Sequence, residues 1–335
     1  MATLLDNWKS VLTTQNLPEE RAMDLGSKWL LIIRASVFPM TITSGAIGGL
    51  LAVAGPTPTD PQWLYFAVAM IGLVLAHAAN NMINDYFDTI GGVDTASYVR
   101  GQYAPHPILS GLVSKGGLLA AIAIVNLIDL GILAWLTQER GPLVVVFALL
   151  GLFISVFYVA PPLQLKHHGW GEPGVALVWG PLMIGGTYFV TTGEIHPWVF
   201  VASLPYAILV TTVLIGKHID KHDADKEKGI HTLPVILGVE RSRFLNQFLM
   251  VSFFGLVLCL VLAGTLGVWT LAVFAAVPKL VGLLRVQGAP RPAEKPANYP
   301  LWPLWYVAWA FVFTRLCGGL FLLGLALNAI FPIFL

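Results

Sequence analysis

Long apolar segments separated by short polar ones dominate the sequence. Each apolar segment is about twenty residues long, which is enough for a helix to cross a hydrocarbon core of ~30 Å. Polar and apolar residues do not alternate within these segments, and this argues against membrane-spanning strands. The pattern predicts an all-α, polytopic membrane bundle of about nine helices, at 28–54, 62–83, 117–136, 142–160, 174–191, 198–216, 244–264, 267–284 and 303–330.

Composition supports a membrane protein and removes one class of partner. Hydrophobic residues make up 56% of the 335 residues and charged residues 11%, well below the roughly one quarter of charged residues in soluble domains. The formal net charge is +1, so no basic excess indicates binding to nucleic acid. Cys259 and Cys317 both fall in apolar segments, where a packing role is expected. The expected surroundings are therefore the lipid bilayer.

The positions of Lys and Arg predict how the bundle is oriented in the cell membrane. With the N-terminus inside, fifteen of the 19 basic residues fall in cytoplasmic segments, as the positive-inside rule requires. Residues 1–27 are amphipathic rather than continuously apolar, which predicts an interfacial segment and no cleavable signal. We expect one integral domain over 28–335, with the active face on the cytoplasmic side where the long polar loops lie.

Two acidic clusters follow the second and the sixth predicted helix. The first lies in NMINDYFDTIGGVD, which starts at Asn81, and the second in DKHDAD, which starts at Asp220. Asp85 and Asp88 are three residues apart, as are Asp220 and Asp223, so each pair is predicted to share a helical face. Carboxylates gathered at one membrane face repel each other unless cations bridge them, and oxygen ligands suit Mg²⁺. The pattern predicts a Mg²⁺ site that binds a diphosphate.

A single acidic cluster in a loop is more often simply solvated. Two clusters at equivalent helix ends favour a shared cation site instead. The candidate metal ligands are Asn84, Asp85, Asp88, Asp94, Asp220, Asp223 and Asp225. Among them, the candidate catalytic residues are Asp85, Asp88 and Asp220.

The clusters and their surroundings resemble the UbiA superfamily of intramembrane prenyltransferases. The resemblance rests on NDYFD at 84–88, VDT at 93–95, YVAPPLQLKHHGWGE at 158–172 and DKHDADKEKGIHTLPVILG at 220–238. The five residues between Asp88 and Asp94 are similar to the spacing in the branch that prenylates 1,4-dihydroxy-2-naphthoate in menaquinone synthesis. The second motif departs from that branch, because Lys221 stands where an aspartate is expected. The aspartates around Lys221 are then expected to share the metal role.

The resemblance implies a Mg²⁺-dependent transfer of a prenyl group from a prenyl diphosphate donor to a small aromatic acceptor, through an allylic carbocation. His218 or His222 is a candidate base for the acceptor proton. The cations near the motifs also fit ordinary positive-inside charge, and Arg34, in the first predicted span, also fits snorkelling to the interface. The candidate substrate-binding residues are Arg34, Asn81, Arg100, Tyr158, Lys166 and Lys217.

Three other functions share parts of this pattern. An intramembrane terpene cyclase would use the same metal and diphosphate site without an acceptor. Prenyl transfer to another acceptor, such as a chlorophyllide, a haem or a glycerol phosphate, would leave the motifs unchanged. A transporter would carry its charges near the membrane midplane, whereas the acidic residues here gather at helix ends, so transport is disfavoured.

Overall fold

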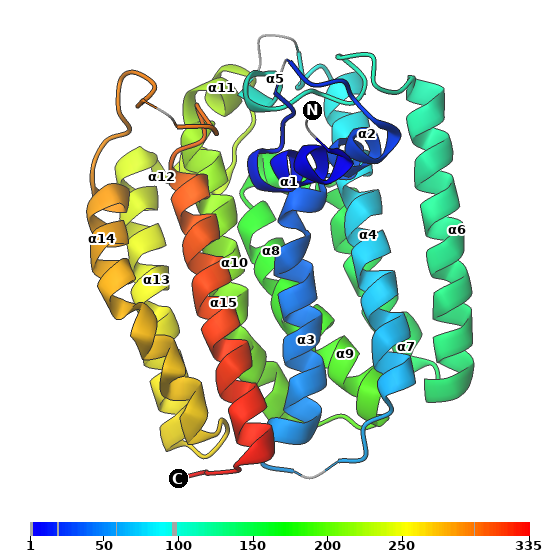
Figure 1. Ribbon diagram of the computed structural model, residues 1–335, viewed down its shortest axis with the longest axis vertical. Helices are drawn as coiled ribbons and strands as arrows, with labels where there is room; N and C mark the ends of the chain where they lie inside the picture. The colour runs from blue at the N-terminus through cyan, green and yellow to red at the C-terminus, as the bar shows by residue number, and fades with distance from the viewer. Residues whose placement is uncertain (1–2, 19, 58, 96–98, 298) are drawn as a thin grey trace.

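The chain folds into a bundle of helices that stand side by side (Figure 1). This computed structural model describes residues 3–18, 20–57, 59–95, 99–297 and 299–335. The bundle is built from α3 (Phe38–Ala54), α4 (Trp63–Ile90), α6 (Lys115–Arg140), α7 (Leu143–Phe157), α8 (Gly171–Leu177), α9 (Met183–Thr192), α10 (Pro197–Asp220), α13 (Val239–Leu262), α14 (Val277–Gly288) and α15 (Tyr306–Ile330). The shorter helices are α1 (Leu4–Thr14), α2 (Leu25–Ile32), α5 (Val99–Tyr103), α11 (His222–Glu227) and α12 (Leu233–Leu237).

Eight helical segments of the described chain are long and apolar enough to cross a membrane. The helix α7, with 15 residues, is shorter and corresponds to the fourth of the nine predicted spans. The other predicted spans correspond to the eight segments, which confirms the all-α, multi-pass architecture. These segments are Ala35–Ala54, Trp63–Ile90, Lys115–Arg140, Gly171–Thr192, Pro197–Asp220, Val239–Leu262, Val268–Gly288 and Tyr306–Ile330.

The first predicted span, 28–54, is divided into two helices by a sharp corner. The helix α2 ends at Ile32, and Arg34 follows with φ 53° and ψ 48°. This left-handed conformation is uncommon for a residue with a side chain, and it interrupts a right-handed helix. The prediction that Arg34 lies inside a membrane helix is therefore wrong. Arg34 instead lies at the corner where the chain enters the bundle.

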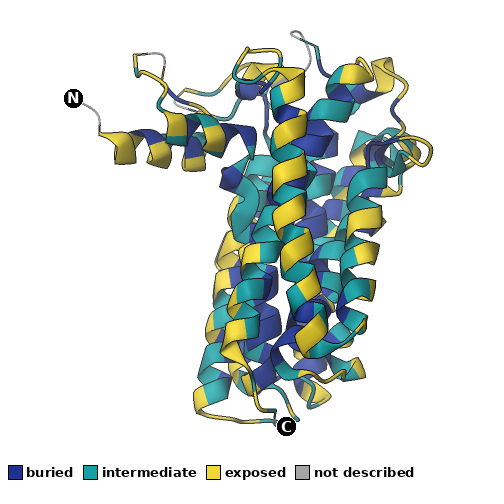
Figure 2. Cartoon of the chain, turned by 90° about the vertical axis from the view of Figure 1, so that its right-hand side faces the viewer, coloured by how far each residue is buried: buried dark blue, intermediate teal, exposed yellow. Residues whose placement is uncertain are grey.

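The N-terminal helix α1 projects sideways from one end of the bundle (Figure 2). Its start is capped by Thr3, whose hydroxyl accepts the amide of Asp6 at 3.2 Å, while the Asp6 carboxylate accepts the amide of Thr3 at 2.8 Å. The indole of Trp8 donates to Asp24 at 3.0 Å and ties α1 to the start of α2. Its apolar side chains Leu4, Leu5 and Leu12 are exposed. Placement of this segment in the membrane interface stays a prediction.

The main core lies among α3, α9, α10, α13 and α15, and glycines allow some of these helices to approach closely. A Cβ atom on Gly48 of α3 would lie 2.5 Å from the carbonyl oxygen of Ile184 in α9. One on Gly216 of α10 would lie 2.9 Å from the amide nitrogen of Val307 in α15. Such distances admit no side chain without movement of the backbone. The end of α10 is therefore held firmly against the start of α15.

Candidate active site

Both acidic motifs lie at the end of the bundle that carries α1, α5 and α11 (Figure 1). A small polar pocket lies between them. Charged side chains predominate in its lining, and proteins keep such groups buried only where they are paired or used. The lining residues are Arg34, Asn84, Asp88, Asp94, Tyr103, Tyr158, Lys166, Lys217, His218 and Lys221.

The two aspartates at the end of α4 each contact a cation from another part of the chain. Asp85 is fully buried and accepts hydrogen bonds from the Arg34 guanidinium. Asp88 accepts from Lys166 Nζ at 2.6 and 2.8 Å. Because Asp85 and Asp88 are three residues apart on one helix, both reach the same side of α4, as predicted. The groups that face them are these cations rather than the aspartates of the second motif.

Arg34 reaches Asp85 because the chain turns at this residue. The side-chain amide of Asn81 donates to the carbonyl oxygen of Ile33 at 3.0 Å and holds the corner against α4. Burial disfavours the charge of Arg34, but Asp85, Tyr103 and Asp94 together outweigh burial and raise the pKa of Arg34 above its ordinary value. Arg34 is thus a permanent cation at the edge of the pocket.

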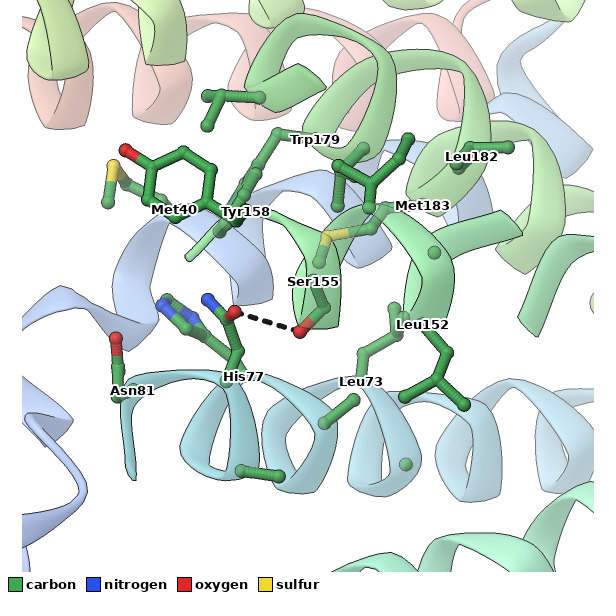
Figure 3. Close-up of a pocket in the computed structure, with 18 of the residues that line it drawn as sticks. Met40, Leu73, His77, Asn81, Leu152, Ser155, Tyr158, Trp179, Leu182 and Met183 are labelled. Atoms are coloured by element: carbon green, nitrogen blue, oxygen red, sulfur yellow. Dashed lines mark hydrogen bonds between the residues drawn. The ribbon is translucent and has the colours of Figure 1, made fainter. Parts of the chain in front are cut away.

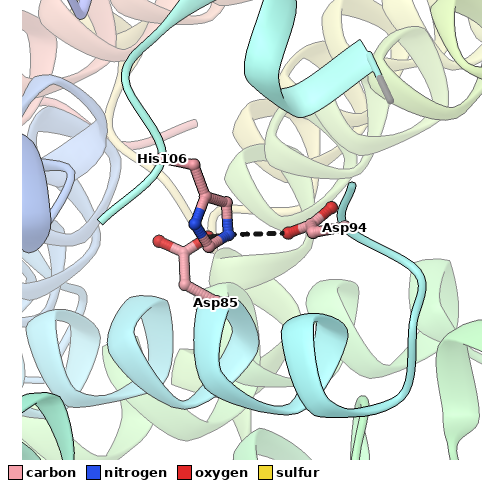
Figure 4. A group of neighbouring side chains, drawn as sticks. All are labelled: Asp85, Asp94 and His106. Carbon is pink, nitrogen blue, oxygen red and sulfur yellow. Dashed lines mark hydrogen bonds and ion pairs between the residues drawn. The ribbon is translucent and has the colours of Figure 1, made fainter. Parts of the chain in front are cut away.

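Asp94 and Asp85 lie close together, and the side chain of His106 is a neighbour of both (Figure 4). After α4 the chain folds back, and the amides of Val93 and Asp94 donate to the carbonyl oxygen of Asp88 at 2.8 and 2.9 Å. His106 Nε2 lies 3.1 Å from Asp94 Oδ2 and 3.7 Å from Asp85 Oδ1. Burial disfavours ionisation of Asp94, but the hydrogen bond with His106 and the nearby cations outweigh it and lower the pKa of Asp94 below its ordinary value. Asp94 is therefore a carboxylate at neutral pH.

The oxygen atoms of the first motif fit a divalent cation. Ligand atoms of Asp85, Asp94 and His106 all lie within 4.8 Å of one another. The buried atoms Asn84 Oδ1 and Asp94 Oδ1 have no hydrogen-bond partner among the described residues. A buried acceptor without a donor costs about 1–3 kcal/mol, and a bound cation would remove this cost. Mg²⁺ prefers oxygen ligands, so His106 suits orienting the carboxylates better than binding the ion.

Asp220, the first aspartate of the second motif, caps α15. Its carboxylate accepts hydrogen bonds from three consecutive amides, those of residues 305–307, at 2.9, 3.0 and 3.0 Å. A carboxylate is favourable there because the N-terminus of a helix carries unpaired donors and partial positive charge. The helix α10 ends at Asp220, and α11 begins at His222. Asp220 and Asp223 therefore do not share the helical face that their spacing predicts.

Beyond Asp220, the second motif lines the pocket with Lys221 rather than with a carboxylate. The side chain of Asp223 is fully exposed, and its carboxylate lies 2.8 Å from His222 Nδ1. Asp225 is buried, and its carboxylate lies 3.9 Å from Lys221 Nζ. Lys217, in the last turn of α10, and Lys221, the residue after its end, both line the pocket.

The turn after α7 brings Lys166 to the pocket beside a chain of buried polar groups. The amide of Lys166 donates to the carbonyl oxygen of Tyr158 at 2.9 Å. The Tyr158 hydroxyl lies 3.4 Å from His218 Nε2, and His218 Nδ1 lies 2.7 Å from Glu172 Oε1. Burial raises the pKa of Tyr158, so its hydroxyl stays protonated at neutral pH. Glu172 thus orients His218 toward Tyr158.

A larger apolar cavity, with a volume of about 600 Å³, opens from the polar pocket into the bundle. The two spaces share Arg34, Asn84, Tyr103, Tyr158 and Lys217 as lining residues. This volume is typical of a site for a small molecule. Figure 3 shows side chains that line the cavity, among them Met40, Leu73, His77, Leu152, Trp179, Leu182 and Met183.

The structure brings most of the predicted residues together. Asn81 supports the corner at Arg34, whereas Asp220 and Asp223 point elsewhere. The side chain of Arg100 lies outside the described residues. Sequence reasoning assigned no role to His106, Glu172 or the ammonium of Lys221, although the last two stand in quoted motifs. The residues that gather at or beside the pocket are Arg34, Asn84, Asp85, Asp88, Asp94, Tyr158, Lys166, Lys217 and Asp225.

Comparison with known proteins identifies the family. The model of the UbiA prenyltransferase family matches residues 42–302. The 1,4-dihydroxy-2-naphthoate octaprenyltransferase of Bacillus subtilis is 26% identical over 247 residues, which cover 72% of this chain and 78% of that protein. The chloroplastic chlorophyll synthase of Arabidopsis thaliana is 29% identical over 198 residues, which cover 56% of this chain and 48% of that protein.

A solved structure shares the fold. It is that of a UbiA homologue from Archaeoglobus fulgidus bound to GPP and Mg²⁺, with a TM-score of 0.61 and 15% identity, and the match covers 89% of this chain and 99% of that one. At this identity the likeness shows the fold alone. The family match spans most of the chain and includes both acidic motifs, so the protein is a membrane prenyltransferase that belongs to the UbiA family.

Proposed function

We propose that this protein transfers a prenyl group from a prenyl diphosphate to a small aromatic acceptor, with 1,4-dihydroxy-2-naphthoate as the leading candidate. The observation that carries the proposal is the junction between the polar pocket and the apolar cavity. Arg34 and three lysines line the first together with Asp88 and Asp94. Apolar side chains predominate in the second, and Arg34 and Tyr158 line both spaces. A donor with an anionic head and an apolar tail matches the two spaces at once.

The cations of the pocket would bind the diphosphate. Lys166 and Lys217 supply ammonium groups, and Arg34 supplies a planar guanidinium, all of which suit phosphate oxygens. Asn84, Asp85 and Asp94, with Asp88 nearby, would hold Mg²⁺, which neutralises charge on a leaving pyrophosphate when it is bound. The homologue from Archaeoglobus fulgidus, which binds GPP and Mg²⁺, supports this pairing of ligands.

The proposed reaction breaks the allylic C–O bond of the donor, and the electron pair leaves with the pyrophosphate. Arg34 and the lysines stabilise the charge that develops on the leaving group. A ring carbon of the acceptor forms the new C–C bond and then loses the substituent it displaces, a proton or CO₂. The ring of Tyr158, at the junction, would face the allylic cation. If a proton leaves, His218 is a better candidate base than His222. His218 lines the pocket and is oriented by Glu172, whereas His222 contacts the exposed Asp223.

The acceptor rests on the spacing of the first motif and on the naphthoate prenyltransferase relative. The chlorophyll synthase relative supports a chlorophyllide as the second candidate. We also propose that the end with the polar pocket faces the cytoplasm, because most Lys and Arg residues fall in the segments at that end.

The test is a product assay with purified protein, Mg²⁺ and prenyl diphosphates of increasing length, with and without 1,4-dihydroxy-2-naphthoate or chlorophyllide. We expect pyrophosphate release that depends on the naphthoate, together with a product whose mass is that of a prenylated naphthoate. A prenylated chlorophyllide would instead assign the second acceptor. Acceptor-independent pyrophosphate release with a cyclic hydrocarbon would replace the proposal with a terpene cyclase.

A further inference from the structure

The second acidic motif does not assemble a metal site among the described residues. Asp220 is used by the backbone of α15, and Asp223 is fully exposed. Asp225 remains near the pocket, but an ammonium group lies 3.9 Å from its carboxylate. In the described part of the chain, the ligand atoms that converge within 4.8 Å belong to Asp85, Asp94 and His106, all of them in or just after the first motif. The first motif therefore brings three candidate ligand atoms together, whereas the second brings one carboxylate, that of Asp225, beside the pocket.

Lysines occupy the side of the pocket where the second motif would place carboxylates. Lys217, in the last turn of α10, and Lys221, just after its end, line the same pocket as Asp88 and Asp94. Lys221 is buried, with 7% of its surface exposed. A buried ammonium is stabilised by nearby anions, of which the carboxylate of Asp225, at 3.9 Å, is one. A diphosphate bound in the pocket would supply further anionic oxygens.

A second divalent cation and these lysines would compete for the same place. A divalent ion repels an ammonium group a few ångströms away, and the repulsion is strong where little water screens it. An ammonium can itself take over part of the role of a metal ion, because it offers positive charge and hydrogen-bond donors to phosphate oxygens. Its position is set by the protein and not by a ligand shell.

We propose that this protein binds a prenyl diphosphate together with one divalent cation, held by the first acidic motif, and that the ammonium groups of Lys217 and Lys221 stand where a second divalent cation would otherwise bind. The proposal rests on the proposed function, because it concerns the same diphosphate. It differs from the prediction that two acidic clusters hold bridging cations. The single-ion stoichiometry is a property that can be measured without turnover.

The test counts bound Mn²⁺, used in place of Mg²⁺, by electron paramagnetic resonance. Purified protein is titrated in the presence of saturating geranyl thiolodiphosphate, an unreactive analogue of the donor. We expect one Mn²⁺ per chain. The analogue should either be required for this Mn²⁺ to bind or increase the affinity of the protein for it. Two Mn²⁺ per chain would overturn the proposal while leaving the proposed function in place. If the analogue and Mn²⁺ do not bind at all, the proposed function fails as well.

Variants of Lys221 test the number of bound Mn²⁺ ions more directly. Lys221→Asp should raise the stoichiometry from one Mn²⁺ to two, because it adds a carboxylate beside Asp225 and removes the competing charge. Lys221→Met should keep one Mn²⁺ but weaken analogue binding at least tenfold. The matched control is Lys226→Asp, a change to an exposed lysine in the next helix, which should alter neither value. A Lys221→Met variant with unchanged analogue affinity, or one that gains a second Mn²⁺, would refute the role of this ammonium.

Discussion

Replacement of Asp220 by alanine tests whether this aspartate of the second motif serves the fold or the metal. Asp220 accepts three backbone amides at the start of α15, and it is 6% exposed. We therefore expect Asp220→Ala to reduce stability, because the amides lose a charged acceptor in a place that water enters poorly. The exposed Asp223 offers the matched control, since Asp223→Ala removes the same charge from the same motif.

The size of the effect follows from the number of bonds that are lost. A hydrogen bond to a charged group contributes about 1.5–3 kcal/mol, and a buried donor left without an acceptor costs about 1–3 kcal/mol. These contributions do not add in full, because the end of the helix relaxes, and loss of a capping residue usually costs about 0.5–2 kcal/mol. We expect a loss of about 3 kcal/mol, which corresponds to a fall in Tm of at least about 5 °C.

The measurement is thermal unfolding in detergent, followed by intrinsic fluorescence, for the wild type, Asp220→Ala, Asp220→Asn and Asp223→Ala. Asp220→Asn keeps one oxygen acceptor and should lie between the wild type and Asp220→Ala. Asp223→Ala should unfold within about 1 °C of the wild type. The interpretation fails if Asp220→Ala leaves Tm unchanged but abolishes Mn²⁺ binding, because Asp220 would then be a metal ligand.

Three further changes test other parts of the structure. Lys166→Ala should weaken binding of a prenyl diphosphate analogue at least tenfold, about 1.4 kcal/mol, because it removes a buried cation of the pocket. The control Lys115→Ala, at an exposed position, should leave this affinity unchanged. If Lys166→Ala bound the analogue as tightly as the wild type, the role of Lys166 would be contradicted. Gly186→Leu should shorten the longest prenyl chain accepted, read from product mass, because Gly186 lines the apolar cavity; an unchanged chain-length profile would place the tail elsewhere. Gly216→Val should abolish folded, monodisperse protein, since its Cβ would lie 2.9–3.0 Å from backbone atoms of residues 306 and 307; normal gel filtration would show that the contact yields.

The helices of the bundle could be predicted from the sequence because the length and continuity of the apolar segments determine them. The predicted span 198–216 lies within α10, and the predicted 142–160 contains α7. Pairs that lie on one helix were also predictable. Asp85 and Asp88 share a face of α4 because the helix continues past both of them.

The parts of the site that could not be predicted depend on contacts between distant segments. The helix α10 ends at Asp220, whose carboxylate accepts amides at the start of α15, and these amides lie 85 or more residues further along the chain. The position of His106 beside Asp94 depends on the path of the loop after α4, and local spacing does not encode that path. Arg34 looked like a residue within a helix because its neighbours are apolar, whereas its pairing with Asp85 spans 51 residues.

The left-handed corner at Arg34 connects the N-terminal helices directly to the polar pocket. Arg34 follows the end of α2 by two residues, and α2 is tied to α1 through Trp8 and Asp24. A displacement of α1 would therefore be transmitted through α2 to the guanidinium that contacts Asp85. Purification tags and fusion partners are therefore better placed at the C-terminus, which lies at the opposite end of the bundle (Figure 1). An attachment that displaces α1 would also displace Arg34, which lines the polar pocket.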